Sequence, residues 1–248
     1  MTRKIISLFS GAGGMDIGFH QAGFKTVVAV EQDSSCCATL KKNMPDAPII
    51  EGDITQVTTE AILAIAQLKP LESALVVGGP PCQSFSLAGK RMGLDDPRGR
   101  LVLEFIRVVR ESLPVAFVME NVKGMMNWEG GKALEAILQE ASEPIVYQGQ
   151  TYQYQVNYQV LDAVNYGAPQ FRERIFIVGN RVGKNFNFPK PTHAANETIQ
   201  QVDLFNQPKQ SWLSVWDGIG ALPPAQEPSE QALKVAGTIK DRIVKHGY

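Results

Sequence analysis

Short apolar runs alternate with stretches of helical periodicity along most of this chain. The runs that predict buried strands are 4–9, 26–30, 49–50, 74–77, 115–119, 155–161 and 174–178. Between them, apolar residues recur at helical spacing in 15–22, 58–68 and 101–113. Strand and helix in repeated succession are typical of a parallel sheet covered by helices on both faces. The pattern therefore predicts an α/β fold built on a doubly wound, mostly parallel sheet.

The character of the chain changes after Gly179. Prolines stand at positions 189, 191, 208, 223, 224 and 228, and helical spacing returns only in 229–245. Such a stretch is typical of irregular chain with few regular elements. We therefore divide the chain into a folded domain at 1–180 and an extended linker with a terminal helix at 181–248.

A glycine-rich turn, within the stretch SLFSGAGGMDIGF, joins the first predicted strand to the first helical stretch. Glycines at such a turn let the backbone bend tightly and approach a ligand closely. Glu31 ends the second predicted strand 20 residues after Gly11. That spacing suits a carboxylate that accepts hydrogen bonds from ribose hydroxyls. The alternative is that the glycines form only a strand-to-helix turn.

A third predicted strand, at 49–50, leads to a second carboxylate. Asp53 could receive the exocyclic amine of an adenine, with Ile54 against the ring. An adenosine-containing cofactor is therefore expected. The strict dinucleotide pattern requires Gly or Ala at position 16, where this chain has Asp16. A single-adenosine cofactor is accordingly favoured over a nicotinamide or flavin dinucleotide.

The block GGPPCQSFS, at 78–86, follows the fourth predicted strand. Its two prolines stiffen the chain and fix the direction of the Cys82 thiol. The carboxyl end of a strand is where an open α/β sheet places its chemistry. Cys82 is therefore a candidate nucleophile. The alternative, a cysteine buried in a turn, is less natural beside the polar neighbours Gln83 and Ser86.

Two further blocks carry charged residues at strand ends. Glu120, in VMENV, emerges from an apolar strand, where burial disfavours the charged carboxylate. Such an acid can donate a proton to a ring nitrogen while a thiolate attacks the same ring. Arg172 and Arg174, in QFRER, alternate on an extended segment and so share one face. They suit a phosphate and a carbonyl oxygen. The alternatives are that Glu120 only caps the following turn and that the arginines lie on a solvated edge strand.

Taken in order, these blocks resemble the cytosine-5 DNA methyltransferases, which use S-adenosylmethionine. The resemblance runs from Lys4 to about Pro224 and rests on FSGAGG, VEQD, GDI, GGPPCQSFS, ENV and QFRERIFIVG. It implies a Rossmann-like methyltransferase fold, with 1–180 as the cofactor-binding and catalytic domain.

The resemblance also implies a set of cofactor-binding residues. They are Phe9, Gly11, Gly13, Gly14, Glu31, Asp53, Ile54, Pro80 and Leu101. Phe9 would stack on the adenine, and the glycine backbone would lie beside the methionine part. Glu31 would bind the ribose, and Pro80 and Leu101 would line the pocket.

The implied catalytic residues are Cys82, Glu120, Arg172 and Arg174. The Cys82 thiolate would add to carbon 6 of cytosine while Glu120 stabilises a proton at nitrogen 3, which makes carbon 5 nucleophilic. Arg174 would lie near the cytosine carbonyl and Arg172 near a phosphate. The base must first leave the duplex stack.

A local basic segment is expected to meet the DNA. The formal net charge is −1, so the chain as a whole carries no positive excess. Loop 84–100 nevertheless has more basic than acidic residues. We expect the DNA contacts to come from Gln83, Ser86, Lys90, Arg91 and Arg98. A solvated loop without a DNA role is the alternative.

Members of the family continue with a target-recognition domain and a GNSV or GNAV block, and neither string occurs here. The resemblance is to the large subunit of a split, two-chain enzyme of the AquI type, which is incomplete without its partner. The expected partner is a smaller subunit that carries the recognition domain and the missing C-terminal motifs. An inactive fragment of a single-chain enzyme, or a cytosine-5 methyltransferase acting on RNA, are the alternatives.

The cysteines and the hydropathy bear on cellular location, metal binding and membrane association. Three cysteines, two of them adjacent, form neither a disulfide framework nor a zinc-ligand spacing. A reducing, cytoplasmic location without a metal site is expected. No apolar run reaches the length of about 18 residues that a membrane span needs, so no membrane partner is expected.

Overall fold

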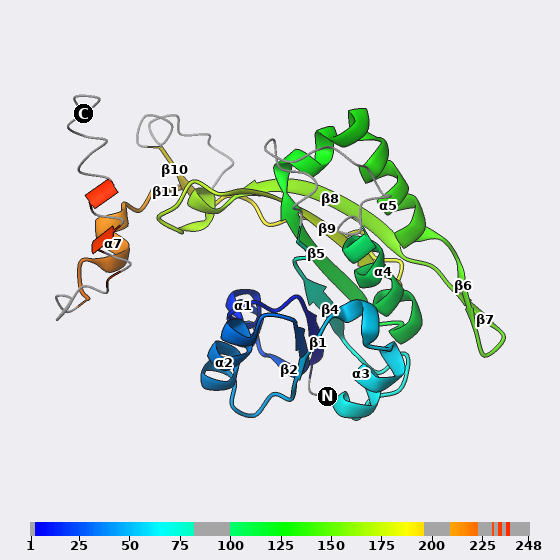
Figure 1. Cartoon of the computed structure of the whole chain (residues 1–248). Helices are drawn as coiled ribbons and strands as arrows, with labels where there is room; N and C mark the ends of the chain where they lie inside the picture. The colour runs from blue at the N-terminus through cyan, green and yellow to red at the C-terminus, as the bar shows by residue number, and fades with distance from the viewer. Residues whose placement is uncertain are drawn as a thin grey trace.

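A seven-stranded sheet of order β3-β2-β1-β4-β5-β9-β8 forms the centre of the protein (Figure 1). The computed structural model describes residues 3–81, 100–195 and 209–222, together with 230, 233, 234, 237 and 238. The strands of the sheet are β1 (Arg3–Leu8), β2 (Phe24–Glu31), β3 (Ile49–Glu51), β4 (Leu75–Gly78), β5 (Ala116–Val122), β8 (Gln155–Asp162) and β9 (Glu173–Asn180). All seven predicted strands are confirmed, with bounds that differ by a few residues.

The first five strands of the sheet, from β3 to β5, run parallel. β9 pairs antiparallel with β5, and β8 pairs antiparallel with β9. The carboxyl ends of the parallel strands therefore meet at the same edge as the start of β9. The prediction of a mostly parallel, Rossmann-like α/β fold is confirmed.

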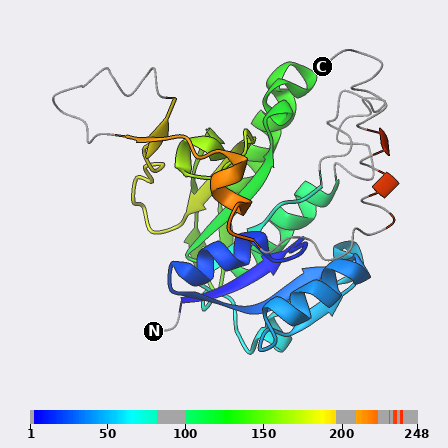
Figure 2. The same ribbon diagram turned by 90° about the vertical axis from the view of Figure 1, so that its left-hand side faces the viewer.

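Helices cover both faces of the sheet (Figure 1 and Figure 2). They are α1 (Gly14–Gln21), α2 (Ser34–Asn43), α3 (Thr59–Ala66), α4 (Arg100–Ser112) and α5 (Lys132–Ser142), with 3-10 turns η1 (Ile54–Gln56), η4 (Lys123–Gly131) and η5 (Ala163–Tyr166). α3, α4 and α5 bury apolar side chains in the main core, where Phe105 and Phe117 make an edge-to-face contact with ring centroids 6.2 Å apart. α1 and α2 pack on the opposite face, against smaller clusters that contain Ile5 and Ala29.

Some elements have weak signals in the sequence. α2 buries only Cys37 and Leu40, so its apolar spacing is faint; its start is marked by Asp33, whose side chain accepts a hydrogen bond from the Cys36 amide. Other elements that the sequence patterns did not predict are α5, the hairpin of β6 (Ile145–Tyr147) and β7 (Gln150–Tyr152), β10 (His193–Ala194), β11 (Gln210–Ser211) and α7 (Val215–Ile219).

The region predicted to be an extended linker with a terminal helix, 181–248, lies only partly within the described residues. β10 and β11 form a parallel pair, and α7 follows them. Most of the predicted terminal helix, 229–245, lies outside the described residues. Among the described helices, none is both long and apolar enough to cross a membrane.

Candidate active site

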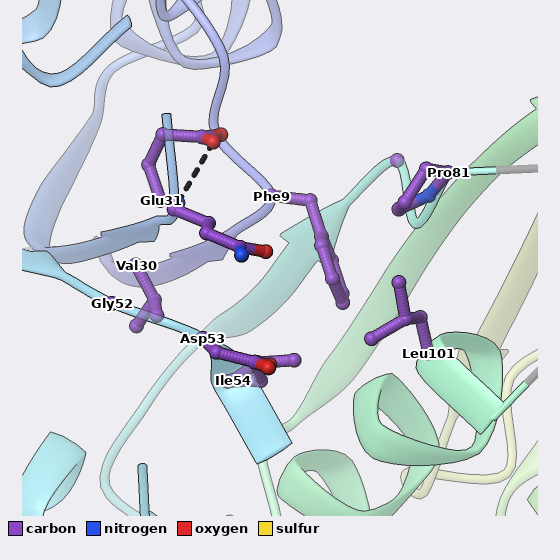
Figure 3. A pocket seen from close by; sticks show the side chains of 10 residues that line it. Phe9, Val30, Glu31, Gly52, Asp53, Ile54, Pro81 and Leu101 are labelled. Atoms are coloured by element: carbon purple, nitrogen blue, oxygen red, sulfur yellow. Dashed lines mark hydrogen bonds between the residues drawn. The ribbon is translucent and has the colours of Figure 1, made fainter. Parts of the chain in front are cut away.

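A cavity opens at the edge of the sheet where the parallel strands end (Figure 3). Its lining residues come from the ends of β1, β2, β3 and β4 and from the start of α4: Phe9, Val30, Glu31, Gln32, Gly52, Asp53, Ile54, Gly79, Pro81 and Leu101. In Figure 3 the Phe9 ring points into the cavity, with Ile54 on one side and Leu101 on the other. The cavity thus combines an apolar slot with the carboxylates of Glu31 and Asp53.

The cavity brings together five of the nine residues predicted for the cofactor, namely Phe9, Glu31, Asp53, Ile54 and Leu101. Pro80 is not among its lining residues. Pro80 is buried, and its carbonyl accepts a hydrogen bond of 3.2 Å from Nδ2 of Asn121, while the neighbours Gly79 and Pro81 face the cavity. The cofactor roles of these residues stay predictions.

The turn between β1 and α1 is shaped by left-handed backbone. Phe9 has φ +53°, and Gly11 and Gly13 have φ +54° and +85°. A left-handed conformation costs a residue other than glycine about 1–2 kcal/mol. Phe9 is therefore held in a strained conformation at the mouth of the cavity, which is typical of functional sites.

The carboxylate of Glu31 anchors this turn. Its Oε2 accepts a hydrogen bond of 2.7 Å from the Gly11 amide, and its Oε1 accepts from the amides of Gln32 and Asp33 at 2.8 and 2.9 Å. A carboxylate has room for about four hydrogen bonds. Three backbone donors therefore leave capacity for a hydroxyl of a bound ligand.

Asp16 is a buried polar residue whose structural role the sequence analysis missed. Its Oδ2 accepts from the Ser7 hydroxyl at 2.9 Å and its Oδ1 from the Thr26 hydroxyl at 2.7 Å. Ser10 in the glycine turn donates to Ser7 in turn, at 2.9 Å. Asp16 thus joins α1 to β1 and β2 where the dinucleotide pattern has a small residue. A charged residue inside an otherwise apolar and glycine-rich stretch is the signal that could have revealed it.

Glu120 lies on β5 at the same edge of the sheet, beside the arginines that precede and begin β9. Nε of Arg174 is 2.9 Å from Oε1 of Glu120, and Nη2 of Arg172 is 3.9 Å from the same oxygen. The two guanidinium groups therefore approach one side, as the alternating pattern predicts. The sequence suggested an apolar environment for Glu120, whereas the structure gives this carboxyl group two charged neighbours.

Glu120 also contacts the backbone that leads to Cys82. A Cβ atom placed on Gly79 would lie only 3.2 Å from Oε2 of Glu120. Gly79 precedes Cys82 by three positions, so the carboxylate lies close to the block that contains Cys82. The candidate nucleophile Cys82 and the predicted DNA contacts Gln83, Ser86, Lys90, Arg91 and Arg98 lie outside the described residues.

Comparison with known proteins identifies similar chains over the whole length of this one. The sequence profile of the family described as C-5 cytosine-specific DNA methylase matches residues 3–241. The chain is 66% identical over 248 residues to the type II methyltransferase M.AquIA of Picosynechococcus sp., and the match covers 100% of both chains. It is 41% identical to the type II methyltransferase M.XorII of Xanthomonas oryzae pv. oryzae, of which it covers 57%.

The structural comparison agrees with the sequence comparison. A solved structure assigned as a DNA modification methyltransferase from an E. coli prophage superposes with a TM-score of 0.67 at 27% identity. The match covers 90% of this chain and 56% of that one. The match to M.AquIA covers that whole relative, whereas the chain spans about half the length of the curated relatives described as M1.HphI and M.FnuDI.

Proposed function

Since this chain belongs to the C-5 cytosine-specific DNA methylases, we propose that it transfers a methyl group from S-adenosylmethionine to carbon 5 of cytosine in a specific double-stranded DNA sequence. The observation that carries the proposal is the position of the Glu120 carboxylate. It lies against Gly79, in the block that contains Cys82, and at the edge of the sheet that bears the cavity.

The residues around the cavity fit an adenosine-bearing methyl donor. Phe9, Ile54 and Leu101 offer apolar contacts to a flat ring, and Glu31 and Asp53 offer acceptors to hydroxyl and amine groups. When bound, S-adenosylmethionine would supply an electrophilic methyl carbon.

The chain's own residues would make carbon 5 of the cytosine able to attack the methyl group. The Cys82 thiolate forms a bond to carbon 6, and the ring electrons move so that carbon 5 becomes nucleophilic. Glu120 would hold a proton at nitrogen 3 during this addition, and Arg174, whose Nε is 2.9 Å from Glu120, would assist at the neighbouring carbonyl. Once carbon 5 has taken the methyl group, loss of its proton to a base re-forms the ring double bond and releases the Cys82 sulfur. The target base must be flipped out of the duplex, at a cost of about a few kcal/mol.

Covalent trapping on DNA that contains 5-fluorocytosine, with S-adenosylmethionine present and with the chain both alone and mixed with a candidate smaller subunit, tests this proposal. Fluorine at carbon 5 blocks the last proton loss, so the protein stays bound through Cys82 and migrates as a DNA adduct in denaturing gels. We expect Cys82→Ser to abolish the adduct and Cys36→Ser to leave it intact. RNA of the same sequence serves as the comparison substrate. An adduct of unchanged yield with Cys82→Ser would contradict the mechanism.

We also propose that the chain works as the catalytic subunit beside a smaller chain with a target-recognition domain. The full-length match to M.AquIA supports this, because the other relatives carry about half of their sequence outside the matched region. A second support is the exposure of large apolar side chains next to Arg172 and on α7. Phe171 and Trp216 are 73% and 76% exposed, and the Phe171 ring contacts Trp212 with centroids 5.2 Å apart.

Reconstitution tests the subunit proposal. The chain is purified alone and with a candidate smaller chain, and methyl transfer to DNA is measured with radiolabelled S-adenosylmethionine. We expect activity only in the mixture, and we expect Phe171→Ser with Trp216→Ser to weaken co-purification of the two chains. Full activity of the chain alone would contradict a split enzyme.

A further inference from the structure

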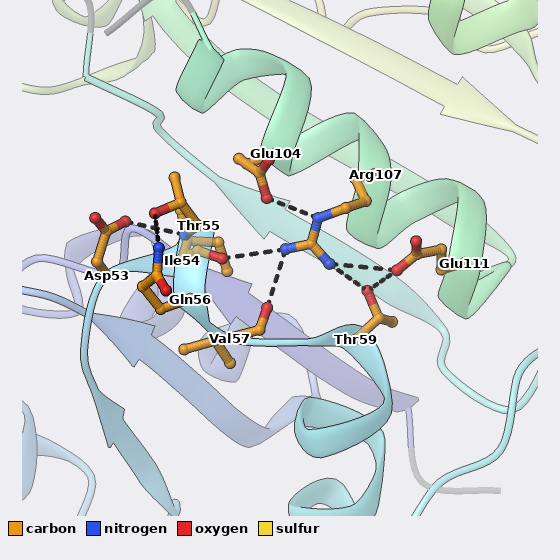
Figure 4. Close-up of polar contacts among 9 residues, drawn as sticks. All are labelled: Asp53, Ile54, Thr55, Gln56, Val57, Thr59, Glu104, Arg107 and Glu111. Carbon is orange, nitrogen blue, oxygen red and sulfur yellow. Dashed lines mark hydrogen bonds and ion pairs between the residues drawn. The ribbon is translucent and has the colours of Figure 1, made fainter. Parts of the chain in front are cut away.

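Arg107 lies on α4, outside the cavity, and makes five hydrogen bonds (Figure 4). Its Nη2 donates to the carbonyl oxygens of Ile54 and Val57, at 3.1 and 3.0 Å. These two carbonyls mark the first residue and the C-cap of η1. The Ile54 carbonyl also accepts from the Val57 amide within the turn, at 3.3 Å. Arg107 donates to one carbonyl at each end of η1 and so ties the turn to α4.

The rest of the guanidinium is held by side chains. Nε donates to Glu104 at 2.6 Å, and Nη1 donates to the Thr59 hydroxyl at 3.0 Å and to Glu111 at 3.3 Å. The Thr59 hydroxyl also donates to Glu111. Glu104 and Glu111 belong to α4 itself and Thr59 begins α3. The planar fork of Arg107 is therefore fixed in one orientation, with its outer edge turned toward η1.

The two elements that Arg107 joins form opposite walls of the cavity. η1 begins at Ile54, directly after Asp53, and both residues line the cavity. Leu101, on the first turn of the same helix as Arg107, lines it from the other side. The separation of these walls decides whether a flat ring fits between Ile54 and Leu101.

We propose that Arg107 is a positioning residue that sets the width of the slot for the adenine of S-adenosylmethionine. The inference rests on the proposed function, since it takes that adenine as the occupant of the slot. Lysine cannot replace arginine here, because the guanidinium group spreads its five hydrogen bonds over Nε, Nη1 and Nη2, whereas lysine has a single ammonium nitrogen. Lysine would keep the positive charge between Glu104 and Glu111, so Arg107→Lys separates the loss of the fork from the loss of charge.

Arg110 provides a matched control on the same helix. Its Nη1 also donates to two backbone carbonyls, those of Glu140 and Glu143, at 2.9 and 3.1 Å. Its side chain is 25% exposed, against 27% for Arg107. Glu140 lies in the last turn of α5 and Glu143 is the C-cap residue of that helix, so Arg110 bonds to the end of α5 and not to a wall of the cavity. Arg110→Lys should therefore cost stability without altering the slot.

Calorimetric titration with S-adenosylmethionine tests the inference, on the full-length chain alone and together with the smaller subunit. We expect Arg107→Lys to weaken binding by about tenfold, because hydrogen bonds from a charged donor to the slot are lost. Arg110→Lys should stay within about twofold of the unsubstituted protein, while both variants lower the thermal unfolding midpoint. In steady-state kinetics, Arg107→Lys should raise the KM for S-adenosylmethionine and leave kcat nearly unchanged.

Different results would identify what is wrong. Equal affinity losses in both variants, or an unchanged affinity in Arg107→Lys, would overturn the positioning role while leaving the proposed function intact. Failure of the unsubstituted protein to bind S-adenosylmethionine in either form would contradict the proposed function, and the inference with it.

Discussion

Arg174 on β9 forms an ion pair with Glu120 on β5, with Nε 2.9 Å from Oε1. Glu120 lies opposite Phe176 and Arg174 opposite Val122 in the antiparallel register. The pair thus runs diagonally across the two strands. The guanidinium holds the carboxylate in place at this edge of the sheet. Under the proposed mechanism, little reorganisation would then be needed when the cytosine ring enters.

Replacement of Glu120 by Gln should lower methyl transfer by roughly 10²–10⁴-fold, because the amide cannot exchange a proton with the ring. Binding of S-adenosylmethionine should change little. Glu173→Gln is the matched control, since Glu173 pairs with Lys123 at 2.7 Å on the same edge. Single-turnover methylation assays measure the effect. Comparable losses in the two variants would mean that Glu120 acts only through its charge.

Phe9 allows a test that separates ring stacking from backbone strain. Removal of the ring in Phe9→Ala or Phe9→Gly should weaken S-adenosylmethionine binding to a similar extent, by about 1–3 kcal/mol. The glycine variant should nevertheless unfold at a higher urea concentration, because glycine adopts the φ of +53° without the strain that alanine retains. A stability difference of about 1 kcal/mol is expected. Equal stability of the two variants would argue against strain at this position.

Asp16→Asn should lower the free energy of unfolding by about 2 kcal/mol, because the Ser7 and Thr26 hydroxyls both donate to the carboxylate and an amide offers only one acceptor oxygen. Urea unfolding followed by circular dichroism measures the change. Asp46→Asn, at an exposed position, is the control. A loss below about 0.5 kcal/mol, the range of ordinary surface substitutions, would be incompatible with a structural role for the Asp16 network.

Tyr154 predicts a loss of stability at alkaline pH. Burial raises the pKa of its hydroxyl above the ordinary value of 10.0, and the hydroxyl donates to the carbonyl of Pro114 at 2.7 Å. The unfolded chain therefore ionises first as the pH rises past 10, which favours unfolding. The stabilising contribution is complete below pH 10 and is lost as the pH rises toward the folded-state pKa.

Tyr154→Phe should reduce stability at neutral pH by about 1 kcal/mol, through loss of the hydrogen bond, and should flatten the decline above pH 10. Urea midpoints between pH 8 and pH 11 would show both effects. The exposed Tyr158, 44% accessible, is the control for the phenylalanine substitution. An alkaline decline that is equally steep in Tyr154→Phe would assign it to other groups.

The sheet could be predicted from the sequence because most of its strands are short apolar runs, while β8 alternates apolar with polar residues. The cavity residues Glu31 and Asp53 could be predicted because parallel strands place their carboxyl ends at one edge, whereas Leu101 was predicted from the resemblance to the family. The contacts of Arg107 could not, since its partners Ile54 and Val57 lie some 50 positions earlier in the chain. Periodicity assigns Arg107 only to the polar side of α4. Which carbonyls it reaches depends on how α4 packs against η1.

The pairing of Glu120 with Arg174 had a similar limit. The sequence placed each residue at a strand end and put Arg172 and Arg174 on one face. It did not reveal that β9 runs antiparallel to β5, and only this direction brings the start of β9 to the end of β5. α2 illustrates the same limit in the helices, since it contributes only Cys37 and Leu40 to the core.

The reversed direction of β9 also determines the route of the chain beyond it. β9 ends at Asn180, at the edge of the sheet opposite the one that bears the cavity. The following segment travels back along the sheet: Asn185 accepts a hydrogen bond from Gln155 at one end of β8, and the Thr192 amide donates to Asn165 beyond its other end. This returning segment, 181–192, must be long enough to span the eight residues of β8, about 27 Å at the usual rise per residue. Deleting a few residues from segment 181–192 would pull β10 away from η5. Lengthening it would leave the hydrogen bonds of Asn185 and Thr192 unchanged.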